Sequence, residues 1–207
     1  MILFDGCSFT MGLELESTKD RFSTLVSDYY NTEHVNLAEG GKSNDGILRT
    51  TIEYCENHTV DFAVIQFTKY SRREILNRKK LLGNARLPYH RLNVGSRDRG
   101  TKEWFTKLAT EEDNVANFYK NKFLLENYFS NKHIPYFFLQ LSSPITSPLQ
   151  SSWEKMSSSS VDCIYEILGG DELSGSPLFT SSDKPHPNIQ GHRKIADHIL
   201  KNPRGSF

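Results

Sequence analysis

The sequence predicts an α/β protein with three layers, in which a central, mostly parallel sheet is flanked by helices. Three short runs, 2–4, 61–67 and 134–141, are almost continuously apolar, as in strands that are buried on both faces. Segments with helical periodicity alternate with these runs, and such alternation is typical of βαβ units. The chain has 207 residues, of which 37% are hydrophobic, and this suits a single domain over 1–207.

Each element is expected from its local pattern. Phe22, Leu25, Val26 and Tyr29 recur at helical spacing, and so do the apolar residues near the chain's end. In chain order we expect a strand at 2–4, a helix at about 20–30, a strand at 34–37, a helix from an N-cap at Ser43 or Asn44 to about 56, a strand at 61–67, a helix at 103–131, a strand at 134–141, a short helix at 161–168 and a closing helix at 189–201.

Charge is distributed unevenly along the chain. The formal net charge is zero, but 69–102 contains 11 Lys and Arg and only two acidic residues, so the remainder is acidic. This segment lacks clean periodicity, and we expect it to be a basic insertion in the domain. One interpretation is a solvated surface that pairs its charges. The other is a cationic wall for an anionic substrate or partner; no motif supports nucleic acid.

Composition excludes several classes of protein. The hydrophobic and aromatic content is too high for a disordered chain, and no apolar run is long enough to span a membrane. Cys7, Cys55 and Cys163 lack the spacing of a zinc site, so we expect reduced thiols and no metal. No secretion signal precedes the first strand, which favours a cytoplasmic protein.

A serine follows the first predicted strand in Gly6-Cys7-Ser8-Phe9-Thr10. A hydroxyl at such a turn becomes a nucleophile only if a base accepts its proton. The alternatives are a serine that serves a turn or helix cap, and Cys7 as a thiol nucleophile.

A possible base lies near the other end of the chain, in Asp183-Lys-Pro-His186. A carboxylate three residues before a histidine can orient the imidazole, fix its tautomer and stabilise the imidazolium. The alternative is a turn-capping Asp183 and a loop histidine. His192 is a second candidate base, but it falls inside the predicted closing helix, where a packing role is the better interpretation.

The loop after the second strand contains Gly40-Gly41-Lys42-Ser43-Asn44. The backbone N–H of Gly41 is a candidate donor to a developing oxyanion, since a glycine allows close approach. The alternative is a plain glycine turn before a capped helix.

Together these three pieces resemble the G-D-S-L, or SGNH, hydrolase family, whose fold is a flavodoxin-like three-layer sandwich. Gly6-Cys7-Ser8-Phe9 is similar to the first block of the family, with Cys7 where Asp is usual. Gly41 matches the glycine block, and Asp183-Lys-Pro-His186 matches the last block. The resemblance runs from residue 3 to the final helix, in the family's order.

The third block departs from the family pattern, which has an Asn whose side chain donates to the oxyanion. Here Thr68-Lys-Tyr70-Ser71-Arg72 follows the strand. Counting along the strand places Tyr70 near the family's Asn. The hydroxyl of Thr68, Tyr70 or Ser71 could donate instead, or Arg72 could supply positive charge. Asn44 from the neighbouring loop is another possible donor, although helix capping is its simpler role. Tyr70 and Arg72 are candidate substrate-binding residues. Losing one oxyanion donor costs roughly 100- to 1,000-fold in rate.

The resemblance implies a serine esterase or acyl hydrolase with no cofactor. Ser8 would attack the ester, His186 would transfer the proton, and Asp183 would orient His186. The implied substrate is a small-molecule or glycan ester, such as a sugar O-acetyl or lipid ester. The middle segment could supply a pocket wall from Tyr89, His90, Trp104 and Phe105; the alternative is that these residues pack on the surface of that segment. Two alternatives stay open: a non-catalytic binding protein on the same scaffold, and an acyltransferase. The Gly-Cys-Ser-Phe-Thr block is also compatible with a bacterial or phage-encoded protein.

Overall fold

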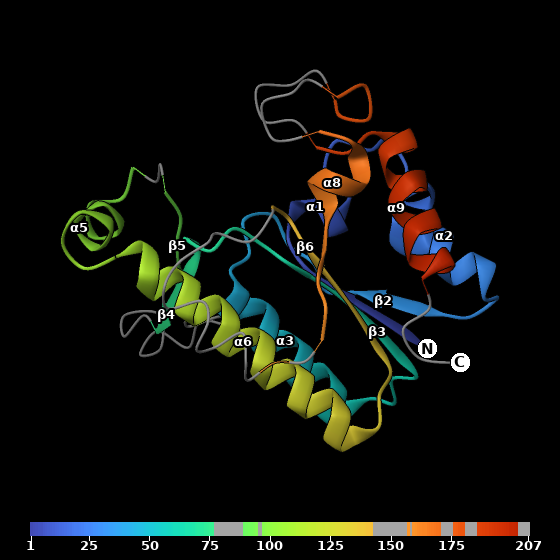
Figure 1. Ribbon diagram of the computed structural model, residues 1–207, viewed down its shortest axis with the longest axis horizontal. Coiled ribbons are helices and arrows are strands. Elements are labelled where there is room, and N and C mark those ends of the chain that lie inside the picture. The colour runs from blue at the N-terminus through green and yellow to red at the C-terminus, as the bar shows by residue number, and fades with distance from the viewer. Residues whose placement is uncertain are drawn as a thin grey trace.

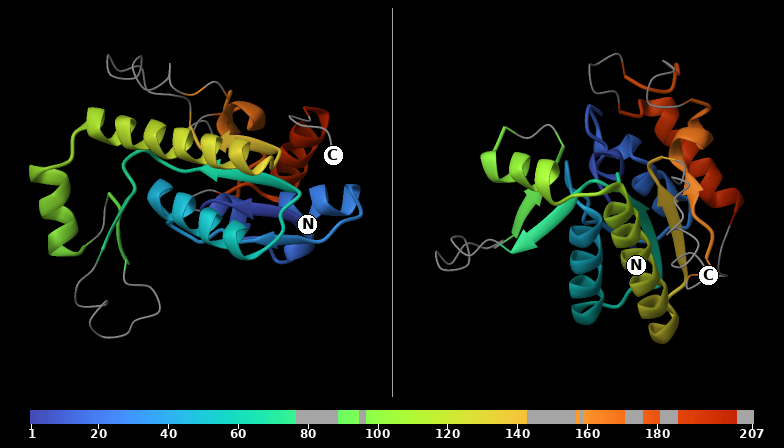
Figure 2. Two further views of the ribbon diagram at one scale, coloured as in Figure 1. Left: turned by 90° about the horizontal axis from the view of Figure 1, so that it is seen from below. Right: turned by 60° about the vertical axis from the view of Figure 1, so that its left-hand side comes forward.

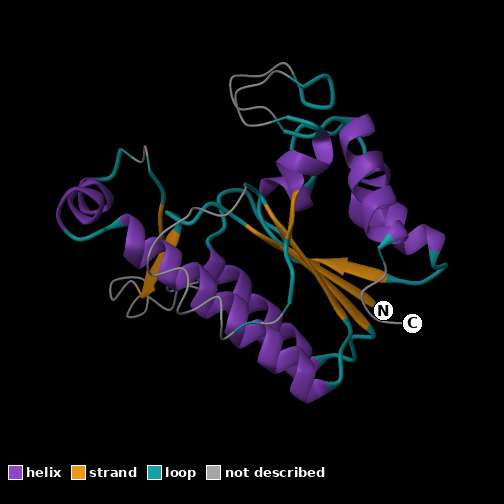
Figure 3. Ribbon diagram, viewed as in Figure 1, coloured by secondary structure: helices purple, strands orange, loops and turns teal. Residues whose placement is uncertain are grey.

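The computed structural model describes residues 1–76, 89–94, 97–142, 157, 159–170, 176–180 and 186–202. Its centre is a parallel sheet with the strand order β2-β1-β3-β6-β7. Figures 1 and 3 show this sheet running through the body of the molecule. Its strands are β1 (Ile2–Asp5), β2 (His34–Asn36), β3 (Phe62–Phe67), β6 (Tyr136–Gln140) and β7 (Asp162–Cys163). The predicted three-layer α/β class is confirmed.

Helices cover both faces of the sheet, as the right-hand panel of Figure 2 shows. On one face α2 packs against α9, and α8 also contacts α9; on the other face α3 packs against α6. The helices are α1 (Ser8–Met11), the 3-10 helix η1 (Thr18–Asp20), α2 (Phe22–Tyr29), α3 (Asn44–Asn57), α5 (Arg99–Lys107), α6 (Glu111–Lys132), α8 (Ile164–Leu168) and α9 (Ile189–Lys201).

Alternation along the strands divides the core into two. In β1, Ile2 and Phe4 face one layer of helices while Leu3 faces the other, because successive strand residues point to opposite faces. The first core joins β1, β3 and β6 to α2, α8 and α9, and the second joins the same strands to α3 and α6. Because both faces of the central strands are covered, these strands are almost continuously apolar.

The segment after β3 forms a small structure of its own beside the main sheet. Strands β4 (Arg73–Leu76) and β5 (Tyr89–Leu92) pair antiparallel, and Figure 1 shows them with α5 on the left of the molecule. Several of its described cations pair with acids: Arg73 with Asp113, Arg91 with Glu39, and Arg99 with Glu103. These pairs agree with the interpretation of a charge-pairing surface.

Two expectations need correction. The helix expected at 103–131 is two helices, α5 and α6, and the break occurs where the Thr110 hydroxyl accepts a hydrogen bond from the Asp113 N–H. This cap satisfies an orphan N–H of a new helix, and three acidic residues in the next turn stabilise that helix end. The segment expected as a helix at 161–168 begins instead with the short strand β7.

The carboxyl ends of the parallel strands meet at one edge of the sheet, which we call the carboxyl rim. The loops after β1, β2, β3 and β6 all start there, and ligand sites of open α/β sheets lie at this edge. No helix within the described ranges is both long enough and apolar enough to cross a membrane.

Candidate active site

Ser8 begins α1 directly after the turn that leaves β1. Ser8 is 7% exposed, and its Oγ lies 4.0 Å from Cys7 Sγ. The Cys7 side chain is fully buried, and its thiol donates to Gln66 Oε1 at 3.2 Å. Ser8 is therefore the more accessible of the two candidate nucleophiles, although it too is largely covered.

Gln66 of β3 holds the Ser8 turn in place. Its Oε1 accepts from Cys7 N at 3.0 Å and from Thr10 Oγ1 at 3.1 Å. A Cβ on Gly6 would lie 2.8 Å from the same oxygen, so this contact requires glycine at position 6. The signal for Gln66 in the sequence is a single amide within an otherwise apolar strand.

A buried ion pair lies beneath the turn. Lys42 Nζ donates to Asp5 Oδ1 at 2.6 Å and to the Leu37 carbonyl at 2.8 Å, and both ionic side chains are essentially inaccessible. Thr50 and Thr51 of α3 donate to the other carboxylate oxygen. Burial raises the pKa of the Asp5 carboxyl, and the Lys42 ammonium opposes that rise. The network ties the Ser8 turn to the Gly41 loop.

His186 lies against the residue that follows Ser8. The rings of Phe9 and His186 meet edge to face with centroids 5.4 Å apart. Thr180 and His186 pair through their backbones, with Thr180 N donating to His186 O at 2.8 Å. No hydrogen bond joins these two described side chains, Ser8 and His186; catalytic hydrogen bonds often tighten only when substrate binds. Asp183 lies outside the described residues.

His192 packs inside the molecule, as expected. It is fully buried, stacks on Phe22 with ring centroids 5.7 Å apart, and accepts a hydrogen bond from Phe22 N through Nδ1. Burial lowers the pKa of His192 to about 4, and Arg21 adds to that effect. His192 is therefore neutral near pH 7 and links α9 to the start of α2.

Gly41 has the left-handed backbone that glycine adopts without strain, with φ 72°. In the part of the chain that the structure describes, its N–H donates to no other group. The loop that contains it follows β2 at the carboxyl rim, next to the loop that contains Ser8, because β1 and β2 are neighbours. This N–H therefore stays a candidate oxyanion donor.

Asn44 and Thr68 bind one another. Asn44 Oδ1 accepts from Thr68 N at 2.8 Å, while Asn44 Nδ2 donates to Thr68 O at 3.4 Å. The Thr68 hydroxyl accepts from Arg72 Nη1 at 2.6 Å. Both Asn44 and Thr68 are buried. The structure therefore brings the two candidate oxyanion donors together, and their hydrogen bonds connect the start of α3 to the loop after β3. Ser43, rather than Asn44, caps α3.

Tyr70 is also buried, with its ring packed edge to face on Phe118. Its hydroxyl accepts a hydrogen bond from Gln140 Nε2. Tyr70 therefore joins the loop after β3 to the end of β6. Arg72, the other candidate substrate-binding residue, is half-buried beside Thr68.

A cavity of about 510 Å³ opens at the carboxyl rim between the loop after β3 and the helices α5 and α6. It combines apolar side chains with hydroxyl, amide and charged groups, as small-molecule sites do. Its lining is Lys69, Tyr70, Ser71, Val94, Phe105, Ala109, Thr110, Glu111, Asn114 and Ser142. Of the four residues suggested for a pocket wall, Phe105 lines this cavity, whereas Tyr89, His90 and Trp104 do not.

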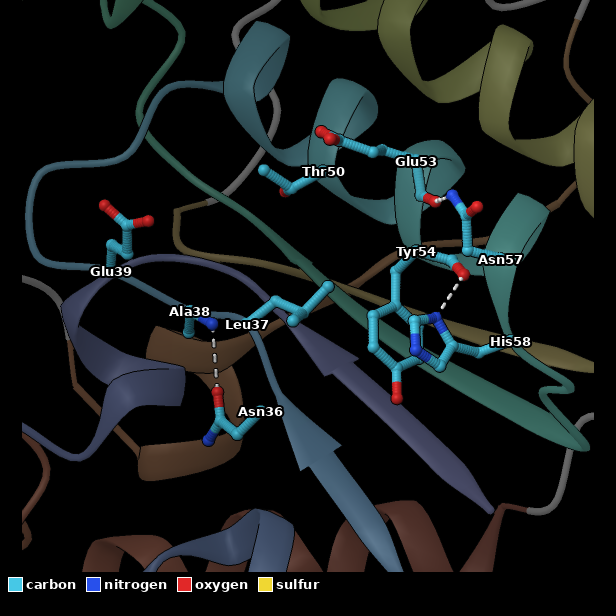
Figure 4. Close-up of a pocket in the computed structure, with 9 residues that line it drawn as sticks. All are labelled: Asn36, Leu37, Ala38, Glu39, Thr50, Glu53, Tyr54, Asn57 and His58. Carbon is cyan, nitrogen blue, oxygen red and sulfur yellow. Dashed lines mark hydrogen bonds between the residues drawn. The ribbon is translucent and has the colours of Figure 1, made fainter. Parts of the chain in front are cut away.

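A second cavity, also about 510 Å³, lies between the outer strand β2 and α3. Figure 4 shows its lining, with the loop after β2 on one side and Thr50, Glu53, Tyr54, Asn57 and His58 of the α3 segment on the other. The Tyr54 and His58 rings stack with centroids 4.0 Å apart. This cavity includes none of the residues predicted for the active site.

Solved structures with the same architecture cover nearly the whole chain. A lipolytic protein of the G-D-S-L family from Desulfitobacterium hafniense DCB-2 matches with TM-score 0.58 at 11% identity, covering 97% of both chains. The fold is that of the G-D-S-L hydrolases. TesA matches with TM-score 0.60 at 12% identity, covering 97% of this chain and 96% of its own. The esterase EstA from Pseudoalteromonas sp. matches with TM-score 0.59 at 14% identity, covering 97% of this chain and 94% of its own.

Sequence comparison adds no closer relative: no family model matches the chain, and neither does any curated protein. The G-D-S-L fold is therefore recognised through its architecture and through the short blocks around Ser8, Gly41 and His186. Sequence reasoning proposed those three residues because each lies in a local motif. It missed Gln66 and Lys42, whose roles depend on partners far along the chain.

Proposed function

We propose that this protein is a serine hydrolase that cleaves carboxylic esters. The observation that carries the proposal is the meeting of two distant blocks on a G-D-S-L fold: the Phe9 ring, next to Ser8, contacts the ring of His186. The resemblance assigns these blocks to a nucleophile and its base, and the contact between Phe9 and His186 supports that assignment.

The proposed reaction has two steps. Ser8 Oγ forms a bond to the ester carbonyl carbon as its proton passes to His186, and the leaving alcohol then departs with that proton. Water then attacks the acyl carbon as its proton passes to His186; the bond to Ser8 Oγ breaks, the acid leaves, and His186 returns the proton to Ser8. In this mechanism Asp183 orients His186, and the Gly41 N–H stabilises the oxyanion.

Asn44 and Thr68 are proposed to support the oxyanion site by fixing the loops around it. Each bonds the other, and Thr68 also binds Arg72, so the guanidinium adds positive charge near the third block. The rim cavity beside Tyr70 is the proposed acyl or alcohol pocket. Its volume suits an ester of a small molecule or a single sugar unit.

A fluorophosphonate probe tests the proposal directly. We expect the probe to label the wild type, and Ser8→Ala to abolish labelling and lower kcat on an aryl ester by about 10⁶-fold. Ser17→Ala is the matched control: its hydroxyl accepts from Lys19 N in a surface turn, so labelling should persist. A folded wild type that neither labels nor hydrolyses esters contradicts the proposal. Esterase activity that survives Ser8→Ala and is lost in Cys7→Ser assigns the nucleophile to the thiol.

The third block favours one alternative, a non-catalytic binding protein on the same scaffold. Tyr70 stands where the family has its Asn, and its hydroxyl is occupied by Gln140 inside the molecule. A binding protein would give no label yet retain affinity for an intact ester or its acid product. Isothermal titration with the Ser8→Ala variant separates that outcome from simple loss of the site.

A further inference from the structure

A second carboxylate faces His186, from the same turn that presents Ser8. Glu14 Oε2 lies 3.4 Å from His186 Nδ1. That nitrogen is buried and, among the residues that the structure describes, has no hydrogen-bond partner. We propose that Glu14 is a positioning residue for His186 in addition to Asp183: its carboxylate accepts a hydrogen bond from Nδ1–H and so leaves Nε2 to receive the proton of Ser8. This inference rests on the proposed hydrolase function.

The chain holds Glu14 in place through Thr180. The Thr180 hydroxyl donates to Glu14 Oε2 and accepts from His186 N at 3.1 Å. One hydroxyl therefore fixes the carboxylate and the histidine backbone relative to each other. A carboxylate can only accept hydrogen bonds, so its approach to Nδ1 selects the tautomer with the proton on that nitrogen.

The backbone around Glu14 is also unusual. Leu13 N donates to Ser8 O at 3.0 Å, so the chain turns back immediately after α1. Glu14 then has φ 72°, a conformation that is uncommon for a residue other than glycine. The turn that contains the nucleophile thus also directs a carboxylate at the base. The Glu14 side chain is 31% exposed and can move the short distance that a hydrogen bond requires.

The test compares Glu14→Gln with Glu16→Gln in the full-length protein. Glutamine keeps the shape of the side chain but can donate to Nδ1, so we expect kcat to fall about 10- to 100-fold with little change in KM. This is less than the roughly 10⁴-fold loss at a buried triad aspartate, because Glu14 is partly exposed. Glu16 is exposed on the same loop, and its substitution should change neither constant.

Histidine ¹⁵N NMR supplies a readout that needs no activity. The His186 signals, assigned by their loss in His186→Gln, should show the Nδ1–H tautomer in the wild type and a shift toward Nε2–H in Glu14→Gln. Glu14→Asp, which keeps the charge, should restore the tautomer in part. If Glu14→Gln leaves both tautomer and kcat at wild-type values while Asp183→Asn changes them, the proposal is overturned. Failure of the wild type to hydrolyse esters defeats the proposed function instead, and the tautomer comparison still tests the Glu14–His186 pair.

Discussion

At the scale of single residues, the buried Lys42–Asp5 pair is the clearest case of mutual dependence. Neither charge has access to water: their side chains are 1% and 0% exposed. Removing one partner leaves the other charge buried without an opposite charge beside it, which costs far more than the pair itself contributes. The pair therefore constrains the sequence at both positions together.

We expect Lys42→Met to lower the free energy of unfolding by about 3–5 kcal/mol, measured by chemical denaturation at neutral pH. Lys132→Met is the control, because Lys132 pairs with Glu56 at 3.0 Å with both side chains about half exposed, and such pairs contribute about 0–1 kcal/mol. Equal effects of the two substitutions would show that the buried carboxylate has another means of compensation.

From the sequence alone, candidate site residues could be proposed where they belong to short motifs. Ser8, Gly41 and His186 stand in recognisable blocks, and the positive φ of Gly41 agrees with a role that needs glycine. The partners of Lys42 and Gln66 could not be predicted, because Asp5 and Cys7 become their neighbours only when β1 joins the sheet.

At the scale of elements, the Thr110 cap decides where one helix ends and another begins. The helical periodicity runs across this point, so periodicity alone predicted a single helix. The cap and the acidic turn after it were visible as Thr-Glu-Glu-Asp, but their effect depended on α6 packing against α3. Strand β7, with two residues, is too short to carry any periodic signal.

Thr110→Ala should destabilise the protein by about 1 kcal/mol, since the orphan N–H of Asp113 loses its acceptor. Thermal unfolding followed by circular dichroism measures the change. The control is Thr106→Ala in α5, where the hydroxyl bonds only carbonyls of its own helix on an exposed face. If Thr106→Ala lowers stability as much as Thr110→Ala does, the result would argue against a stabilising cap at Thr110.

At the scale of the whole molecule, His192 couples two helices of one layer. It belongs to α9, and its ring is packed on Phe22 at the start of α2. Because burial lowers its pKa to about 4, from an ordinary value of 6.5, the unfolded chain binds a proton that the folded chain does not bind between these limits.

This group therefore leaves stability unchanged above about pH 6.5, and stability falls as pH drops from there toward 4. The loss is complete near pH 4 and amounts to roughly 3 kcal/mol. Urea denaturation of the wild type and His192→Gln at pH 7.5 and pH 4.5 measures it: the variant should lose less stability on acidification. His58→Gln, at an exposed position, should follow the wild type. If His192→Gln loses as much stability between pH 7.5 and pH 4.5 as the wild type does, the acid sensitivity has another source.

The pairing of β1 with strands on both sides also bears on how the protein is made. Ile2 lies opposite His34 on one side and Phe62 on the other, and β3 in turn pairs with β6, which includes Tyr136. A chain emerging from the ribosome can complete this sheet only after most of it has been synthesised, and such distant pairings slow folding. The block with Ser8 is synthesised before the block with His186, so the proposed active site can form only after both blocks have left the ribosome.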